Sequence, residues 1–316
     1  MPAFVVLPLV LCAALIGSAF LGRSAFVPAT SDTEAFLGGA ATRVQAVQAY
    51  VEQVQVPRYS YVRDTNVADP RLDARAVLLL DAQTGQVLYQ HQAQVPLPIA
   101  SITKLMSALV TRDLWDMGEV VTVASSAVRV DGVKRTLNAG ERITVGNLLS
   151  LMLVESSNDA AFALAHYAQE QGIDFVARMN AMAIKLGMRA CEFGDPAGLD
   201  DTAKCTASDV GRLMLVLWKE HPDLLTITRS QRLAVPTLDG GVHTASTTNQ
   251  LLATMSSILG GKTGNTDGAL GCLALLVESQ EKHGTLMSAV LGSRARFTDT
   301  TALLNWATTA YHFSND

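Results

Sequence analysis

The order of the apolar patterns along the chain constrains its fold more than any other feature. Two β-type runs in residues 74–90 flank the turn Asp81–Gly85, and two more runs, CLALLV and LMSAVLG, follow residue 270. Helical patterns fill most of the chain between them. Because strands lie at both ends, we predict an α+β fold. N- and C-terminal strands would form one antiparallel sheet flanked by helices, with an all-helical subdomain inserted between them.

Several of the predicted helices are marked by their ends as well as by their periodicity. Residues 144–169 predict two helices separated by a turn near Glu155–Asp159, and the helix that follows is expected to stop at Gly187. Thr206 and Asp209 have the spacing of a capping box before ASDVGRLMLVLW. Thr298 is expected to cap a last helix that runs to Phe313.

The first 23 residues are expected to direct the chain to the cell envelope. Residues 2–22 contain no charge and are long enough to span a bilayer, and Arg23 follows. Small residues at Gly17 and Ala19 also offer a site for cleavage of a secretory signal, although a positive n-region is missing. Residues 1–23 are therefore assigned as a signal peptide or an N-terminal membrane anchor, with both alternatives open.

The next 49 residues are predicted to connect this segment to the folded domain. Residues 24–43 are rich in Ala, Ser, Thr and Gly, whereas residues 44–54 place valines at helical spacing. We therefore expect a linker and a short helix over residues 24–72, and one domain over residues 73–316.

Composition excludes several functional classes. The chain has a net charge of −5 and no basic block or basic–aromatic run, which argues against nucleic acid as a partner. Its six histidines are scattered without ligand spacing, so neither a metal nor another cofactor is expected. Once Cys12 is set aside with the N-terminal segment, three cysteines remain. Cys191 and Cys205 form a disulfide in one interpretation and stay buried thiols in the other.

A glycine-flanked stretch, GGKTGNTDG at residues 260–268, raises the first functional question. A phosphate-binding P-loop has the pattern G-x-x-x-x-G-K-[ST] and would need glycine at position 256. That position holds Ser256, and the residues before Gly260 are not glycine-rich. The pattern therefore favours a different kind of active site.

Two other short motifs precede this K-T-G in a suggestive order. S-x-x-K occupies residues 101–104, S-x-N residues 156–158 and K-T-G residues 262–264. Alone, Ser101 would be assigned as a helix cap and Asn158 as a turn residue. Together the three motifs predict an acyl-transfer site. Its expected catalytic residues are Ser101, Lys104 and Ser156, and its expected substrate-binding residues are Asn158, Lys262, Thr263 and Gly264.

The chemistry explains why these residue types would occur together. A serine hydroxyl is a weak nucleophile that needs an adjacent base, and residues i and i+3 share one helix face, so Lys104 can reach Ser101. Lysine is a base only when neutral, and burial beside a second cation such as Lys262 lowers its pKa. Ser156 can relay a proton to the leaving amine, and Asn158 can hold the substrate amide. Backbone N–H groups at the start of the Ser101 helix and on the K-T-G strand can form an oxyanion hole.

The motif set resembles that of the penicillin-binding protein and serine β-lactamase superfamily. Within it the chain is most similar to the low-molecular-mass D-alanyl-D-alanine carboxypeptidases and endopeptidases (peptidase S11), from about residue 73 to the C-terminus. The segments that carry this resemblance are PIASITKLMSALV, LNAGERITVGNLLSLMLVESSNDAAFALA, MNAMAIKLGM, FGDPAGLDD and GGKTGNTDGALGCLALL.

This resemblance implies a β-lactamase/transpeptidase-like fold and hydrolysis of D-Ala–D-Ala-type bonds in peptidoglycan stem peptides. Ser101 would be acylated and water would release the product, without a cofactor. The resemblance also makes Asn265 an expected substrate-binding residue, whose backbone N–H would complete the oxyanion hole. β-Lactam antibiotics would act as covalent inhibitors, and the enzyme would reside in the periplasm or cell envelope, reaching the membrane only through its N-terminal segment.

The sequence departs from the family pattern at three points. Thr248 stands where several members carry an arginine that binds a carboxylate, which resembles the endopeptidase-like subgroup. Asn265 stands where many members carry a histidine or aromatic residue, and we expect no C-terminal β-domain after the last predicted helix. Arg294 and Arg296 are alternative candidates for the carboxylate contact, or else solvated surface residues.

The same motifs also allow two functions other than that of a peptidase. A class A-like β-lactamase needs a deacylating glutamate, and Glu192 lies at a suitable distance along the chain from Ser156. However, Glu192 is followed by Phe-Gly-Asp-Pro and not by the E-x-x-L-N pattern. A non-catalytic penicillin-binding sensor would keep the acyl group and release no product. The sequence does not separate carboxypeptidase from endopeptidase activity, because both use the same three motifs.

Overall fold

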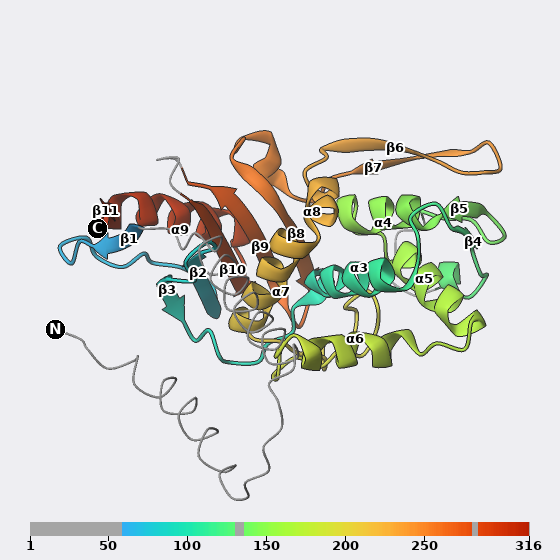
Figure 1. Cartoon of the computed structure of the whole chain (residues 1–316), viewed down its shortest axis with the longest axis horizontal. Helices are drawn as coiled ribbons and strands as arrows, with labels where there is room; N and C mark the ends of the chain where they lie inside the picture. Colours follow the sequence, from blue (N-terminus) through green and yellow to red (C-terminus); the bar gives the residue numbers. More distant parts are fainter. Residues whose placement is uncertain (1–58, 130–135, 280–283, 316) are drawn as a thin grey trace, which may run out of the picture. The chain divides into compact units, whose positions relative to one another are not determined.

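A computed structural model describes residues 59–129, 136–279 and 284–315 (Figure 1). The predicted signal or anchor at residues 1–23 and the short helix at residues 44–54 lie outside the described residues. Within the described ranges, no helix is both long enough and apolar enough to cross a membrane.

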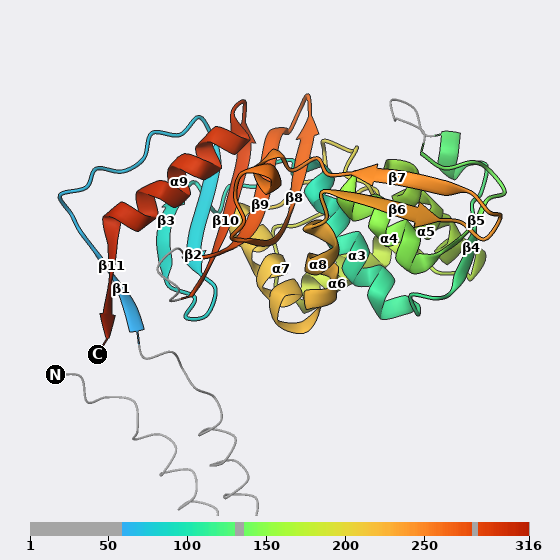
Figure 2. The same cartoon turned by 90° about the horizontal axis from the view of Figure 1, so that it is seen from above.

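The central sheet confirms the prediction that both ends of the domain contribute strands. It has five antiparallel strands in the order β3-β2-β10-β9-β8 (Figures 1 and 2). These strands are β2 (Ala76–Asp81), β3 (Val87–His91), β8 (Ile258–Thr266), β9 (Leu270–Glu278) and β10 (Thr285–Ser293). The K-T-G motif lies on β8, which is an edge strand of this sheet.

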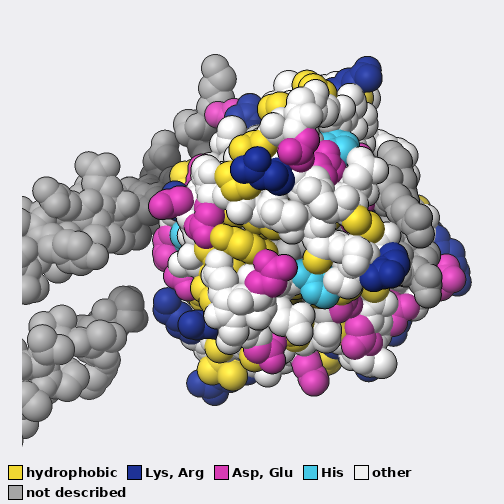
Figure 3. All heavy atoms as spheres, turned by 90° about the vertical axis from the view of Figure 1, so that its right-hand side faces the viewer, with side chains coloured by type: hydrophobic (Ala, Val, Ile, Leu, Met, Phe, Trp, Pro, Cys, Tyr) yellow, Lys and Arg dark blue, Asp and Glu magenta, His cyan; other side chains and the backbone are white. Residues whose placement is uncertain are grey.

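The inserted block between β3 and β8 is mostly helical, as predicted. Its helices are η1 (Ala100–Ile102), α3 (Thr103–Leu114), η2 (Ala127–Arg129), α4 (Val145–Val154), α5 (Asn158–Glu170), α6 (Phe175–Lys185), α7 (Ala207–Glu220), α8 (Pro222–Thr228) and η3 (Gln250–Ala253). The block also holds two antiparallel pairs that the sequence did not predict, namely β4 (Val120–Thr122) with β5 (Arg142–Thr144) and β6 (Arg232–Pro236) with β7 (Val242–Ser246). Its outer end, seen in Figure 3, mixes acidic, basic and apolar side chains.

Helix caps explain why several helices begin where they do. Thr144, Ser157, Asp174 and Thr206 each accept a hydrogen bond from a backbone N–H in the first turn of α4, α5, α6 and α7. The predicted turn between α4 and α5 and the predicted cap at Thr206 are therefore confirmed. After α6 the chain reverses at Gly187, which has a φ of +72°, as expected for a glycine that ends a helix.

The C-terminal prediction was wrong at both ends of the last helix. Helix α9 spans Arg296–Ala310, so Thr298 lies inside it and does not cap it. The first turn of α9 is closed by the backbone N–H of Asp299, which donates to the Ala295 carbonyl at 2.9 Å. The Ser293 hydroxyl, at the end of β10, donates to the Asp299 carboxylate at 2.6 Å and ties this turn to the strand. After α9 the chain does not stay helical to Phe313 but forms β11 (Tyr311–Asn315).

Strand β11 pairs in antiparallel fashion with β1 (Tyr59–Arg63). Strand β1 lies within the segment that the sequence assigned to the linker. The folded part of the chain therefore starts before residue 73. The sequence pattern gave no sign of this pairing because the two strands are short and lie more than 240 residues apart.

Each face of the central sheet packs against its own hydrophobic core. Along β2, Leu78 belongs to the core under α7, whereas Val77 and Leu79 belong to the core under α9. This alternation follows from the two-residue period of a strand. Gly211 lets α7 come close to the sheet, because a Cβ there would lie 2.8 Å from Leu78.

Candidate active site

The serine of the first motif lies in the short η1 turn before α3. Ala100, directly before Ser101, has a φ of +48°, a left-handed conformation that is uncommon for a residue with a side chain. Ile102 is the N-cap residue of α3, and no side chain of the described residues accepts a hydrogen bond from the N–H groups of its first turn. The Ser101 hydroxyl is therefore not used as a helix cap. It lies 2.8 Å from Lys104 Nζ, one helical turn away.

Lys104 is completely buried and its amine touches three oxygens. Nζ lies 2.6 Å from Asn158 Oδ1, 2.7 Å from the carbonyl oxygen of Ala197 and 2.8 Å from Ser101 Oγ. The two carbonyl oxygens can only accept, whereas the serine hydroxyl can also donate. A neutral amine has two N–H donors and one lone pair. It satisfies all three contacts only if its lone pair faces the hydroxyl of Ser101.

The electrostatics around Lys104 favour the neutral amine. Burial lowers its pKa well below the ordinary value, and the charge of Lys262 lowers it further. The carboxylates of Asp195 and Asp159 oppose these effects and raise the pKa in part. The net effect is a lowered pKa of Lys104, as a general base requires.

The second and third motifs meet through a direct contact. Ser156 lies between α4 and α5 with a φ of +65°, and its hydroxyl accepts a hydrogen bond from Lys262 Nζ at 2.8 Å. Lys262 is only 2% exposed and also donates to the carbonyl oxygen of Thr263 at 3.1 Å. Burial, followed by the charge of Arg296, lowers the pKa of Lys262 to about 7.

Gly264 allows the K-T-G strand to lie against the start of η1, next to Ser101. A Cβ at this position would stand 2.6 Å from the carbonyl oxygen of Ile99 and 3.2 Å from the amide nitrogen of Ser101. Any side chain would therefore push β8 away from the start of η1. The third residue of this motif must be small for a steric reason that the sequence alone does not reveal.

Comparison with known proteins decides the family. The Peptidase S11 model, D-alanyl-D-alanine carboxypeptidase, matches residues 63–295. The chain belongs to the peptidase S11 family. The D-alanyl-D-alanine endopeptidase of Pseudomonas aeruginosa is 32% identical to it over 75% of this chain and 78% of that protein. The D-alanyl-D-alanine carboxypeptidase DacC of Escherichia coli is 29% identical over 78% of this chain, which spans 64% of the length of DacC.

Solved structures agree with this assignment. The crystal structure of a D-alanyl-D-alanine carboxypeptidase from Mycobacterium tuberculosis matches with a TM-score of 0.71 and 25% identity, covering 78% of this chain and 96% of that one. The β-lactamase/transpeptidase-like fold predicted for this S11 peptidase is thereby confirmed.

Two of the departures from the family pattern, at Thr248 and Asn265, can be located in this S11 peptidase. The Thr248 hydroxyl lies 2.5 Å from that of Thr263, so this chain has a pair of hydroxyls at the position where several family members carry an arginine. Arg296 donates to the side-chain oxygen of Asn265 at 3.0 Å. Arg294 is 80% exposed, and its nearest carboxylate is that of Asp73, at 3.9 Å. Of the two candidate arginines, Arg296 is the one that contacts an expected substrate-binding residue.

Glu192 does not have the surroundings of a deacylating residue. It is exposed, and its backbone exchanges hydrogen bonds with that of Lys204 in an isolated β-bridge. Together with the S11 family match, this position does not favour the β-lactamase alternative.

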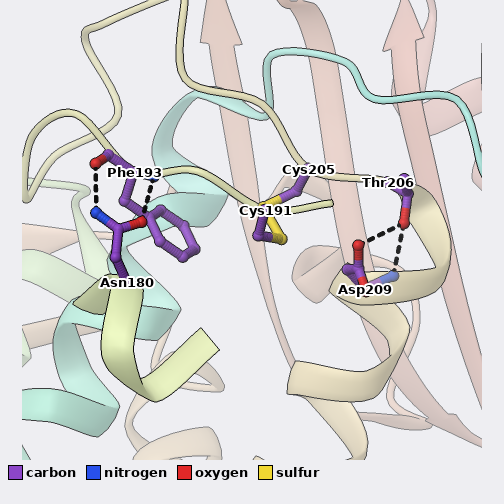
Figure 4. The surroundings of a disulfide bond; sticks show 6 residues. All are labelled: Asn180, Cys191, Phe193, Cys205, Thr206 and Asp209. Atoms are coloured by element: carbon purple, nitrogen blue, oxygen red, sulfur yellow. Dashed lines mark hydrogen bonds between the residues drawn. A yellow bond between two sulfur atoms is a disulfide. The ribbon is translucent and has the colours of Figure 1, made fainter. Parts of the chain in front are cut away.

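Sequence reasoning missed one participant, the loop between Cys191 and Cys205. The two cysteines form a disulfide, which settles the alternative that the sequence left open (Figure 4). The Asn180 amide exchanges two hydrogen bonds with the backbone of Phe193, as Figure 4 shows, and holds the entrance of the loop. The loop presents the carbonyl of Ala197 to Lys104. A backbone carbonyl has no signature in residue type, so only the resemblance of the FGDPAGLDD segment to the family pointed to this region.

Proposed function

We propose that this S11 peptidase cleaves D-Ala–D-Ala-type bonds of peptidoglycan stem peptides through an acyl-enzyme on Ser101. The observation that supports this most strongly is the set of contacts at Lys104. Two carbonyl acceptors take its N–H groups, and the lone pair of the neutral amine is left for the proton of Ser101. The expected roles of Ser156, Lys262 and Asn265 extend the same proposal.

Acylation would begin with transfer of the Ser101 proton to Lys104. The serine oxygen attacks the carbonyl carbon of the penultimate D-alanine, and the backbone N–H groups of Ser101 and Asn265 receive the charge that forms on the carbonyl oxygen. The C–N bond then breaks, and the leaving amine takes a proton from Ser156, which regains one from Lys262. The first product leaves with a free amino group.

Deacylation repeats these steps with water as the nucleophile. Before this step Lys104 releases the proton of Ser101 to solvent and Lys262 takes one up, so that the amine of Lys104 is neutral again. Lys104 then removes a proton from water and the hydroxide attacks the ester carbonyl. The bond to Ser101 Oγ breaks as Lys104 returns that proton to the serine. Asn158 would hold the amide of the donor peptide. Lys262, Thr263 and Arg296 would attract a carboxylate on the leaving side. β-Lactams would acylate the same serine but would be released slowly.

The cellular location belongs to the same proposal. We expect export to the periplasm or cell envelope because the substrate is found there. Residues 1–23 would act either as a cleaved signal or as an inner-membrane anchor.

A digest tests the function directly. Protein from residue 44 onward and its Ser101→Ala variant are incubated with monomeric pentapeptide and with cross-linked dimeric muropeptides, and the masses of the products are read. Loss of one alanine from the pentapeptide with intact dimers identifies a carboxypeptidase. Conversion of dimers to monomers identifies an endopeptidase, and both together identify a dual enzyme. If the wild-type protein and Ser101→Ala both leave every substrate intact, the peptidase proposal fails for these substrates.

A further inference from the structure

The turn at Asp195–Asp200 is held together by a single side chain. Asp195 Oδ1 accepts hydrogen bonds from the backbone N–H groups of Ala197 and Gly198, at 2.6 and 2.7 Å. Its Oδ2 accepts from those of Leu199 and Asp200, at 2.8 and 2.7 Å. A carboxylate that accepts four backbone N–H groups fixes the path of the chain around it.

This turn aims one carbonyl at the general base. Asp195 accepts a hydrogen bond from the N–H of Ala197. The carbonyl of the same residue lies 2.7 Å from Lys104 Nζ. The preceding carbonyl, that of Pro196, accepts from the Ser107 hydroxyl at 2.6 Å, one turn further along α3. The turn is therefore docked on the helix that carries Lys104.

We infer that Asp195 is a positioning residue for acylation, which holds the Ala197 carbonyl against Lys104 and supplies negative charge beside that amine. This inference rests on the proposed acyl-enzyme function and adds a residue that the three motifs do not contain. Asp195 acts on Lys104 and does not itself touch the reacting atoms.

The position of the carbonyl matters because it occupies one N–H group of Lys104. With that acceptor displaced, the amine can rotate and turn its lone pair away from Ser101. Misplacement of a reacting group by about 1 Å reduces rates by up to about 100-fold. The charge of Asp195 acts separately, through the pKa of Lys104.

The charged groups that act on Lys104 come from three other parts of the site. Lys262 on β8 lowers its pKa, whereas Asp195 in the turn and Asp159 on α5 raise it. Only the neutral amine accepts a proton from Ser101. Removal of the Asp195 charge should therefore lower the pKa of Lys104 further and shift the acid limb of acylation to lower pH. The pKa of Lys262 is lowered by burial and by Arg296. The part of the pH profile of acylation that depends on Lys262 should therefore not shift when Asp195 is replaced.

Two substitutions separate position from charge. Asp195→Asn removes the charge and keeps one acceptor oxygen for Ala197 and Gly198, which are the contacts next to the Ala197 carbonyl, but its NH2 group no longer accepts from Leu199 and Asp200. Asp195→Ala removes the charge and all four contacts. The matched control is Asp200→Asn. Asp200 lies in the same loop, and its carboxylate accepts from the backbone and hydroxyl of Thr202, away from Lys104. The rate constant for acylation by a fluorescent penicillin is measured from pH 5 to 9, and the melting temperature is recorded for each variant.

We expect Asp195→Asn to shift the acid limb down by roughly half to one pH unit, with a maximal rate within about threefold of wild type. Asp195→Ala should reduce the maximal rate by about 10- to 100-fold. Asp200→Asn should match wild type in the maximal rate and in the position of the acid limb. A lower melting temperature without any change of rate or profile would overturn the inference. If Asp195→Ala does not fold, an acid limb in Asp195→Asn that coincides with wild type overturns it as well. Absence of acylation in the wild-type protein would instead refute the proposed function.

Discussion

The two faces of the central sheet use buried residues in opposite ways. The face covered by α9 packs apolar side chains such as Val77, Leu275 and Leu303 against one another. On the other side, where η1, α3 and α5 meet the edge strand β8, the chain buries two lysines, Lys104 and Lys262, and the charge of Lys262 lowers the pKa of Lys104. Burial of a charged group is unfavourable unless the group is paired. The two buried lysines are therefore expected to lower the stability of the fold while they provide reactive groups. The α9 face is expected to supply stability without taking part in the chemistry.

Lys104→Met offers the strongest test of this contrast. Loss of the proposed general base should reduce acylation by about 100- to 10,000-fold. Because a buried lysine with a lowered pKa disfavours folding, the melting temperature should stay the same or rise. Stopped-flow acylation with a fluorescent penicillin and thermal unfolding measure the two effects. A large drop in melting temperature would show that the buried lysine stabilises the fold, contrary to the comparison.

Leu303→Ala probes the opposite face. Leu303 is fully buried in the core under α9, and its truncation should lower the free energy of unfolding by about 2–5 kcal/mol. Acylation per folded molecule should be unchanged, since this core lies across the sheet from Lys104. Urea unfolding gives the stability, and titration with a labelled β-lactam gives the fraction of active sites. A slower acylation rate in the folded fraction would indicate that the two faces are coupled.

The Cys191–Cys205 disulfide belongs to the reactive side but is itself a stabilising link. Removing the cross-link with Cys191→Ser and Cys205→Ser should destabilise the protein by about 3 kcal/mol, the chain-entropy value for a loop of about 15 residues. Because the loop presents the Ala197 carbonyl, acylation should also slow, although by less than in Lys104→Met. Treatment of the wild-type protein with dithiothreitol should reproduce both changes. A normal acylation rate in the double variant would show that the disulfide contributes to stability alone.

The smallest effect is expected from the titration of Lys262. Its pKa of about 7 means that it loses its charge as the pH rises through 7, so KM for a carboxylate-bearing pentapeptide should increase above that pH. The unfolded chain keeps this lysine protonated up to about pH 10.4, the ordinary value. The native state therefore binds fewer protons between these limits, and the free energy of unfolding should rise with pH there. In Lys262→Met, this part of the pH dependence of stability should be missing.

Much of the site could be predicted from the sequence because its signals are local. The spacing of Ser101 and Lys104 on one helix face is fixed by helix geometry. The strands at both ends of the domain and the turn before Asn158 follow from periodicity and capping. These signals needed no knowledge of contacts between distant segments.

Other features could not be predicted because they depend on contacts over long sequence separations. The sequence placed Thr298 as a cap and gave no indication that β11 would pair with β1. It offered Arg294 and Arg296 as equal candidates, and only the fold brings Arg296 to Asn265. Neither side chain carries a local signal of its partner.

The sequence by itself determined the kind of chemistry, because a serine, two lysines and an asparagine in three ordered motifs leave few alternatives. Tertiary structure decided how that chemistry is tuned. The depth of burial that lowers the pKa of Lys104, the contact of Lys262 with Ser156 and the carbonyl of Ala197 all arise when separate segments pack together. Desolvation and hydrogen bonding are properties of a packed environment, and neither is encoded in the identity of a single residue.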